Sequence, residues 1–410
     1  MTTDTIADVL SLQNIRIKAQ RVFAVAEQNR LRAFEYDPCK LDTVADFVVS
    51  VIQADFKGKY ETIPPHGRWQ HFEVGNVARL TQLISTWNQQ GVTSVEVCKR
   101  VLDITFLSVL LDAGAGDKWS YLDGVERYAR SEGLAVASLR CFQKGLFSSN
   151  PENPYQVDGV ALSHLKTEAL ADGFQVSKQN PIAGIEGRAS ILRALGNQLK
   201  SSRPSFFVDS VFPTGDFTSE SLNVERLWSE LQTVLIPIWP ERTKYAGENV
   251  GDAWFLPTIN SIQPFHKLTQ WLTYSLLIPL KRLLHIQVVN ETLLTGLPEY
   301  RNGGLFVDFG VLKLRPEYSL TDEYEPESIV IVEWRAMTVV LLDKLLNMIN
   351  ERMKNELSAP LSLAQMLEAG SWKSGRIIAR KLRPANAGSP ILIKSDDYQE
   401  WLISIFHRFI

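Results

Sequence analysis

The sequence predicts a mainly α-helical protein, and three observations support that prediction. Apolar residues recur at i, i+3 and i+4 spacing in most of the ordered stretches, as they do along one face of an amphipathic helix. Segments that alternate apolar and polar residues are few and short. No GxGxxG motif follows a strand, so we expect no dinucleotide-binding βαβ unit. The expected architecture is a multi-helix globular fold with a small β hairpin or sheet near residues 285–315.

Six segments carry the helical spacing. They cover residues 77–87, 95–111, 187–199, 224–235, 266–284 and 329–349. Two of them begin with a suitable cap, because Ser94 precedes the second segment and Asn223 precedes the fourth. The best period-two segments cover residues 285–289, 305–308 and 311–314, and Gly303, Gly304 and Gly310 are available for turns beside them.

One loop stands out, at residues 148–154 with the sequence SSNPENP. It is short and flanked by apolar segments, and the chain has no internal repeat or low-complexity run. We therefore expect one globular domain over residues 1–410, or two coupled helical lobes that meet near residues 148–158.

Composition narrows the class of protein. With 410 residues, of which 45% are hydrophobic and 22% charged, the chain can bury a large core. A net charge of −3 without a dense Lys/Arg stripe argues against nucleic acid as a partner. The three cysteines form no CxxC pair, which indicates a reducing compartment. Because we find no signal peptide and no apolar run of about 18 residues, we expect a cytoplasmic protein with no membrane partner. The oligomeric state stays open.

Motifs of the familiar cofactor enzymes are absent. The sequence has no P-loop, no HExxH and no GxSxG motif. Its six histidines include no i, i+4 pair beside a carboxylate, so no dedicated metal site is indicated. We expect no cofactor and no metal, and a small polar molecule as the ligand.

Five segments combine polar, charged and aromatic residues with glycines, a composition that a solvated loop rarely needs. In residues 67–73 (GRWQHFE), Arg68 or His71 suits an anionic group, although a turn with an aromatic staple explains the composition equally well. Asp112 ends an apolar helix and Trp119 follows closely, which suits a pocket wall as well as an ordinary helix stop.

The third segment covers residues 244–271. Its candidate residues are Lys244, Asp252, Trp254, His266, Lys267 and Gln270. The last three lie at a helix start, where free backbone N–H groups can converge with side chains on one ligand. A lysine there opposes the helix dipole, which hints that something anionic binds nearby.

The last two segments lie further along the chain. In the fourth, a Gly-rich turn precedes a short strand ending in Asp308, and loops of this kind carry functional sites. The polar residues of that turn are Glu299, Tyr300 and Arg301. In the fifth, Glu333 and Arg335 lie within an apolar helix, where charges need a partner. A ligand or a structural ion pair meets that need equally well.

Together, the segments GRWQHFE, GENVGDAW, QPFHKLTQWLTYSL, LTGLPEYRNGGLFVDFGVL and VEWRAMTVVLLD resemble the uracil catabolism protein 4 family over nearly the whole chain. This resemblance implies a place in a pathway that opens the uracil ring after its attachment to ribose phosphate. That pathway releases urea by way of a ribosylurea-type intermediate.

A weaker resemblance, over residues from about 100 to about 345, is to the queuosine salvage N-glycosylases. These are helical enzymes related in architecture to DNA glycosylases. The matching residues are Glu186, Arg188, Ile191, Leu192 and Gly196 for ERxxILxxxG, Lys244, Ala246, Val250, Asp252 and Trp254 for KxAxxxVxDxW, Lys267 and Gln270 within DYRxPQ, and Glu333 and Arg335 for ExR. The catalytic aspartate of DYRxPQ falls at Phe265, so another carboxylate must serve if the chemistry is the same.

The resemblances together favour a hydrolase that cleaves the N-glycosidic bond of a ribosylurea or a related ribose 5-phosphate derivative. Its catalytic candidates are Glu299, Asp308, Asp252 and His266. Its substrate-binding candidates are His71, Asp112, Trp119, Lys244, Trp254, Lys267, Gln270, Tyr300, Arg301, Glu333 and Arg335, most of which we expect around one pocket. The alternatives are a metal-dependent amidohydrolase or deaminase acting on a ring-opened pyrimidine nucleotide, and a non-catalytic nucleotide-binding module.

Overall fold

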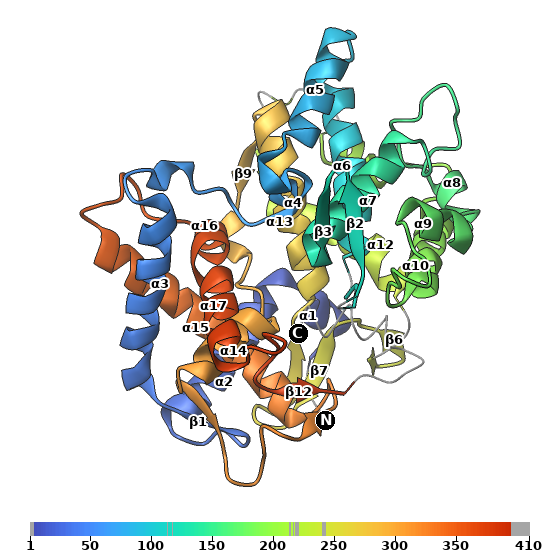
Figure 1. Cartoon of the computed structure of the whole chain (residues 1–410). Helices are drawn as coiled ribbons and strands as arrows, with labels where there is room; N and C mark the ends of the chain where they lie inside the picture. The colour runs from blue at the N-terminus through green and yellow to red at the C-terminus, as the bar shows by residue number, and fades with distance from the viewer. Residues whose placement is uncertain are drawn as a thin grey trace.

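Helices dominate the computed structural model of this chain, which describes residues 4–112, 114–116, 118–212, 215, 217, 221–239 and 243–394 (Figure 1). Strands occur in the described residues only as two-stranded pairs. The prediction of a mainly α fold is therefore confirmed.

Long helices form the centre of the molecule. Helix α15 (Ile329–Met353) packs against α2 (Leu12–Glu27) and α3 (Leu41–Phe56). Helix α13 (Lys267–Leu284), yellow near the centre of Figure 1, packs against α6 (Ser94–Leu110). Almost every side chain of α13 from Lys267 to Leu280 is buried, so this helix has no solvent-facing stripe and its polar residues lie inside the protein.

The remaining helices surround this centre. They are α1 (Ile6–Leu10), α4 (Arg68–Phe72), α5 (Arg79–Gln89), α7 (Arg130–Gln143), α8 (Gly159–Ser163), α9 (Thr167–Gly173), α10 (Ile185–Leu199), α11 (Phe207–Val211), α12 (Val224–Ile238), α14 (Tyr300–Asp308), α16 (Leu363–Met366) and α17 (Trp372–Leu382). A π-helical turn, η6 (Leu367–Ser371), joins α16 to α17. Asn223 caps α12 as predicted, whereas α6 is capped by Thr93, one residue before the predicted Ser94.

The strand pairs of the described residues are short, and three of the six join distant segments. The pairs are β1 (Phe34–Tyr36) with β10 (Leu312–Leu314), β2 (Ser120–Asp123) with β3 (Glu126–Ala129), β4 (Ser221–Asn223) with β9 (Gln287–Val289), β5 (Lys244–Tyr245) with β6 (Glu248–Asn249), β7 (Ala253–Leu256) with β8 (Ser261–Pro264), and β11 (Glu323–Tyr324) with β12 (Leu392–Ile393). Two strands, β9 and β10, lie in the predicted region 285–315, but each pairs with a distant strand rather than with the other.

The strand predicted at residues 305–308 is wrong, because these residues belong to α14. The Glu299 side chain caps this helix by accepting the N–H groups of Arg301 and Asn302. Gly303 is also needed for packing rather than for a turn, since a Cβ there would lie 2.9 Å from Trp334 and Thr338 of α15. The glycine-rich run at residues 303–304 therefore does not form the predicted turn. Instead, Gly303 allows α14 and α15 to approach closely.

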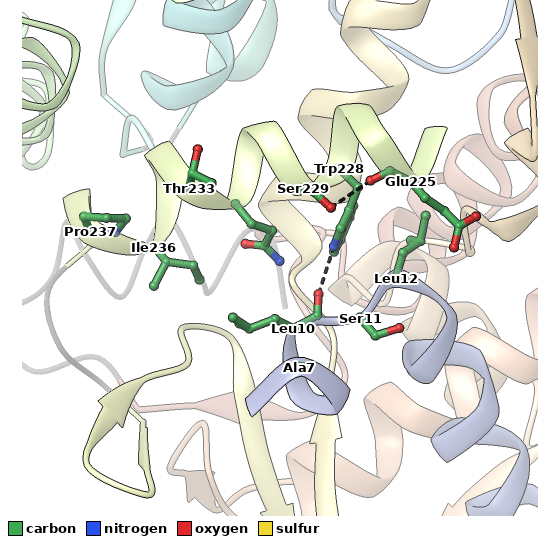
Figure 2. A pocket seen from close by; sticks show the side chains of 11 residues that line it. Ala7, Leu10, Ser11, Leu12, Glu225, Trp228, Ser229, Thr233, Ile236 and Pro237 are labelled. Carbon is green, nitrogen blue, oxygen red and sulfur yellow. Dashed lines mark hydrogen bonds between the residues drawn. The ribbon is translucent and has the colours of Figure 1, made fainter. Parts of the chain in front are cut away.

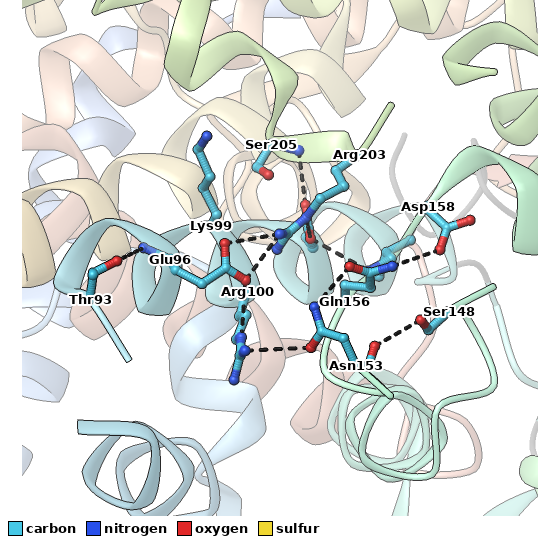
Figure 3. A network of polar contacts seen from close by, with 12 residues as sticks. Thr93, Glu96, Lys99, Arg100, Ser148, Asn153, Gln156, Asp158, Arg203 and Ser205 are labelled. Atoms are coloured by element: carbon cyan, nitrogen blue, oxygen red, sulfur yellow. Dashed lines mark hydrogen bonds and ion pairs between the residues drawn. The ribbon is translucent and has the colours of Figure 1, made fainter. Parts of the chain in front are cut away.

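The loop predicted at residues 148–154 lies between α7, which was not predicted, and α8, and hydrogen bonds hold it in place (Figure 3). Asn153 donates to Gln156 at 3.0 Å and accepts from Arg100 of α6 at 3.4 Å. Gln156 donates in turn to Asp158 at 3.1 Å. The loop is therefore tied back onto α6. None of the described helices combines the length and the apolar character needed to cross a bilayer.

Candidate active site around Lys267

Asp252 organises the start of helix α13. The chain enters this helix through His266, which has a left-handed backbone (φ 42°) that is uncommon for a residue with a side chain. The Asp252 backbone carbonyl accepts the N–H groups of Phe265 at 2.9 Å and His266 at 3.1 Å, and its carboxylate accepts that of Lys267 at 3.1 Å. Asp252 thus satisfies backbone donors that the helix start leaves free.

The Asp252 carboxylate is also half of a buried ion pair. Both guanidinium NH₂ groups of Arg335 donate to it, at 2.8 and 2.7 Å, and the Trp254 indole donates at 2.8 Å. Burial alone would raise the pKa of Asp252, but the charge and hydrogen bonds of Arg335 hold it well below its usual range. The Arg335 guanidinium carbon also lies 3.9 Å from the ring centroid of Phe265. The ring at the position of the glycosylase aspartate is therefore a cation–π partner of Arg335.

Lys267 lies at the centre of this group of charges. Its side chain is buried, and burial lowers its pKa well below the ordinary value. The carboxylates of Glu299, Asp252 and Asp112 act on it in the opposite direction. Charges interact strongly where water is excluded, so the residues at the starts of α13 and α14, before strand β7 and after α6 belong to one electrostatically coupled group.

Glu299 is buried where α14 begins. Its carboxylate accepts the N–H of Asn302 at 2.6 Å and that of Arg301 at 3.0 Å. Burial raises the pKa of Glu299, against the opposing charges of Arg301 and Lys267. The segment leading to Glu299 is fixed by Gln270, which donates to the Thr295 hydroxyl at 2.9 Å. Gln270 is thus a positioning residue in this structure.

A second group of polar side chains faces Lys267 from α4 and α6. Arg68 is fully buried and donates to Asp112 at 2.7 Å and to the Ser108 hydroxyl at 2.9 Å. His71 lies 3.4 Å from the Arg68 guanidinium, and burial together with this neighbouring charge lowers its pKa. Arg188, from the ERxxILxxxG-like helix, donates to the carbonyls of Leu111 at 3.1 Å and Gly114 at 2.9 Å. It therefore fixes the backbone on both sides of Asp112.

Several predicted residues serve other contacts. The Trp119 indole donates to the Phe174 carbonyl at 3.0 Å and stacks on the Phe174 ring. Glu333 is buried and accepts the N–H groups of Arg32 at 2.9 Å and Ala33 at 2.8 Å, so it holds a loop rather than Arg335. Lys244 is exposed on strand β5.

Two of the four catalytic candidates also face away from Lys267. Asp308 lies at the opposite end of α14 from Glu299, where Arg383 binds it through two hydrogen bonds of 2.8 and 2.7 Å. The His266 ring N–H is directed to the Val9 carbonyl at 2.8 Å. Glu299 and Asp252 are the two candidates that the structure places beside Lys267.

Sequence reasoning missed the contribution of α7, η6 and α17. Glu132 lies 3.7 Å from Arg376, and its charge also acts on Arg68 and His71. Glu368 of η6 pairs with His66, whose ring lies 4.5 Å from that of Trp271 on α13. One signal was available, because Trp372, Arg376 and Arg380 recur every four residues and so share one face of α17.

Two further features bear on the site. Among the described residues, no group of three or more His, Cys, Asp or Glu side chains has the arrangement of a metal site. A separate cavity of about 580 Å³ lies between residues 7–12 and α12, and none of the predicted site residues lines it (Figure 2). Its wall includes Trp228, which donates to the Leu10 carbonyl at 2.9 Å and packs edge-on against His266.

Comparisons with known proteins support the resemblance seen in the sequence. The chain matches a family described as "protein of unknown function (DUF1688)" over residues 8–398. It is 74% identical over 396 residues to Protein urg3 of Schizosaccharomyces pombe, covering 97% of this chain and 99% of that protein. It is 40% identical over 439 residues to uracil catabolism protein 4 of Lachancea kluyveri, again covering 97% and 99%. The predicted resemblance is thus confirmed, and this chain belongs to the DUF1688 family.

Proposed function

We propose that this protein is an enzyme of uracil catabolism that hydrolyses the N-glycosidic bond of a ribosylurea or a related ribose 5-phosphate derivative. The name of the Lachancea kluyveri relative supports the pathway. The observation that carries the reaction is the pairing of two buried groups with opposite shifts, since the pKa of Glu299 is raised and that of Lys267 is lowered at one place. Sites that move protons near neutral pH are built from such groups.

Glu299 is the proposed catalytic residue. A carboxyl group with a raised pKa holds a proton that it can give to the ureido nitrogen as the bond from C1′ to that nitrogen breaks. The sugar is left as an oxocarbenium ion. Water then forms a bond to C1′ and gives its proton to the Glu299 carboxylate. One water is consumed, urea and the ribose product leave, and Glu299 regains its starting state.

The neighbouring charges have complementary roles in this proposal. Asp252 is kept ionised by Arg335, and Asp112 accepts from Arg68 through a single oxygen, so each carboxylate is held in one orientation. Their negative charges stabilise the positive charge that develops on the sugar in a buried site where charges are weakly screened. Lys267 binds hydroxyl or ureido oxygens, and its charge partly opposes the rise that burial produces in the pKa of Glu299.

The test is to incubate the purified protein with ribosylurea and with its 5-phosphate, and to measure urea and free reducing sugar. Equimolar release of both products from at least one substrate is the expected result. An Asp308→Asn variant is the matched control, since Asp308 lies on the same helix as Glu299 but is engaged by Arg383. Release of ammonia in place of urea, or no release from either substrate, would contradict the proposal.

A further inference from the structure

Helices α14 and α17 bring several guanidinium groups together beside the Lys267 site. Gly375 makes this possible, because a Cβ there would lie 2.1 Å from the backbone oxygen of Arg301. Arg301 therefore lies directly against α17, with its guanidinium carbon 4.3 Å from the ring centroid of Trp372. The guanidinium carbon of Arg376 lies 5.8 Å from the same centroid. Two guanidinium groups, each positively charged, thus lie near one indole ring.

These charges are not balanced by the protein. Burial lowers the pKa of Arg376, and the positive charges of Arg301 and Arg380 lower it further. In the described part of the chain, the ion-pair partner of Arg376 is Glu132 at 3.7 Å, which is too long for a good hydrogen bond, and Arg301 and Arg380 form no ion pair. The Nε of Arg376 is buried and has no hydrogen-bond acceptor. Such an arrangement is costly unless an anion neutralises it.

There is space for an anion at this place. A cavity of about 410 Å³ is lined by Trp372, Arg376 and Arg380, and Glu368 of η6 forms part of its wall. Lys373 also lines the cavity, but its ammonium is engaged by Asp55. A planar guanidinium with fixed donors is suited to the tetrahedral oxygens of a phosphate group.

The cluster is coupled electrostatically to the proposed active site. Arg301 is two residues from Glu299 and lowers the pKa that burial raises there. Glu132, the partner of Arg376, acts electrostatically on Arg68 and His71. The charges of the two clusters therefore act on one another, as expected of two parts of one ligand site.

We propose that Arg376 and Arg380 form a phosphate-binding subsite, with Arg301 adding positive charge from beside Trp372, so that the substrate of this enzyme is a 5′-phosphorylated ribose derivative rather than a free nucleoside-like molecule. This inference rests on the proposed function, which supplies the part of the substrate other than its phosphate. The subsite itself requires only an organic phosphate.

Binding of ribose 5-phosphate, ribose and inorganic phosphate to the full-length protein, measured by calorimetry, tests the subsite without turnover. We expect ribose 5-phosphate to bind at least about 10-fold more tightly than ribose. Arg376→Gln should weaken ribose 5-phosphate binding by about 10-fold or more, and Arg376→Lys should restore part of it. Lys373→Gln removes one positive charge from the same cavity and should change affinity by less than about twofold. Arg301→Gln is a second variant, should Arg376→Gln fail to fold.

The outcomes separate this inference from the proposed function. If ribose 5-phosphate binding depends on Arg376 but no substrate releases urea, the subsite stands and the reaction is wrong. If urea is released, yet Arg376→Gln and Arg301→Gln leave ribose 5-phosphate binding unchanged, the reaction stands and the subsite is overturned. Equal weakening by Lys373→Gln and Arg376→Gln also overturns the subsite, because it indicates general attraction to positive charge.

Discussion

Two clusters of charged residues in this molecule use the same residue types in opposite ways. In the cluster on α6 (Figure 3), Arg203 binds Glu96 at 3.0 Å and Asp103 at 2.7 Å, and Arg100 binds Glu96 at 3.1 Å. Two carboxylates thus meet two guanidinium groups. In the described part of the α14–α17 cluster, Arg376 has one ion-pair partner, Glu132 at 3.7 Å, and Arg301 and Arg380 form no ion pair. A balanced cluster stabilises the fold alone, whereas an unbalanced one is arranged for a charge that a ligand supplies.

The largest effect on stability is expected from breaking the balanced cluster. Arg203→Met leaves the Asp103 carboxylate, which is fully buried, without its charge partner. We expect the free energy of unfolding, measured by urea denaturation at pH 7, to fall by about 3–5 kcal/mol. Arg352→Met, which removes the partner of the exposed Asp42 and Asp46, is the control and should cost at most about 1 kcal/mol.

The pH dependence of that loss follows from the burial of Asp103. Burial raises the pKa of Asp103 in the folded protein above its unfolded value, although Arg203 opposes this. The folded state therefore binds the proton more tightly, and the carboxylate destabilises the fold more as the pH rises. The destabilisation by Arg203→Met should be smaller at pH 5 than at pH 7. An equal loss at both pH values would mean that packing, not charge, is lost.

A second prediction concerns the pH dependence of catalysis. Because burial raises the pKa of Glu299, its protonated form persists above the ordinary range of a glutamate. If Glu299 is the proton donor, kcat/KM should be level below this raised pKa and decline toward about tenfold per pH unit above it. A profile that rises with pH over the same range would contradict the assignment, since it would require an ionised carboxylate.

The smallest effect on stability is expected in the unbalanced cluster. Arg376→Gln removes a charge that other arginines repel, so the ligand-free protein should keep its stability within about 0.5 kcal/mol or gain slightly. Thermal unfolding without phosphate measures this change. A loss comparable to that of Arg203→Met would remove the distinction between the two clusters.

The same contrast explains what the sequence could predict. Apolar periodicity identified α5, α6, α10, α12, α13 and α15, because a helix that buries a face must repeat its pattern, but α2, α3 and α7 were not predicted. It failed at residues 303–308, where glycines are explained by close packing on Trp334 rather than by a turn. Some short strands were poorly predicted because their partners lie far away in the chain, as for β4 and β9, whereas hairpins such as β5–β6 were missed because strands of two residues show no period-two pattern.

Residue types at helix starts helped to predict the residues of the candidate site. Residue types on α17, which has the sequence pattern of a surface helix, did not. Lys267 was singled out because a lysine at a helix start opposes the dipole, Glu299 because it lies in a Gly-rich turn, and Arg335 because charge within an apolar helix needs a partner. The arginines of α17 have the spacing of an ordinary exposed basic face, and only the approach of Arg301 at Gly375 distinguishes them. Whether a charge is balanced depends on tertiary contacts, which local sequence does not encode.

The most direct test of the central claim is the effect of Glu299→Gln on urea release, compared with Asp308→Asn in the same helix. Glutamine can keep one of the two hydrogen bonds that cap α14, through its amide oxygen, but cannot give or take the proton, so we expect kcat to fall by about 10²-fold or more while ribose 5-phosphate binding is retained. Asp308→Asn should keep kcat within about threefold. Near-normal urea release by Glu299→Gln, with the fold intact, would contradict the account and leave Asp252 as the next carboxylate to examine.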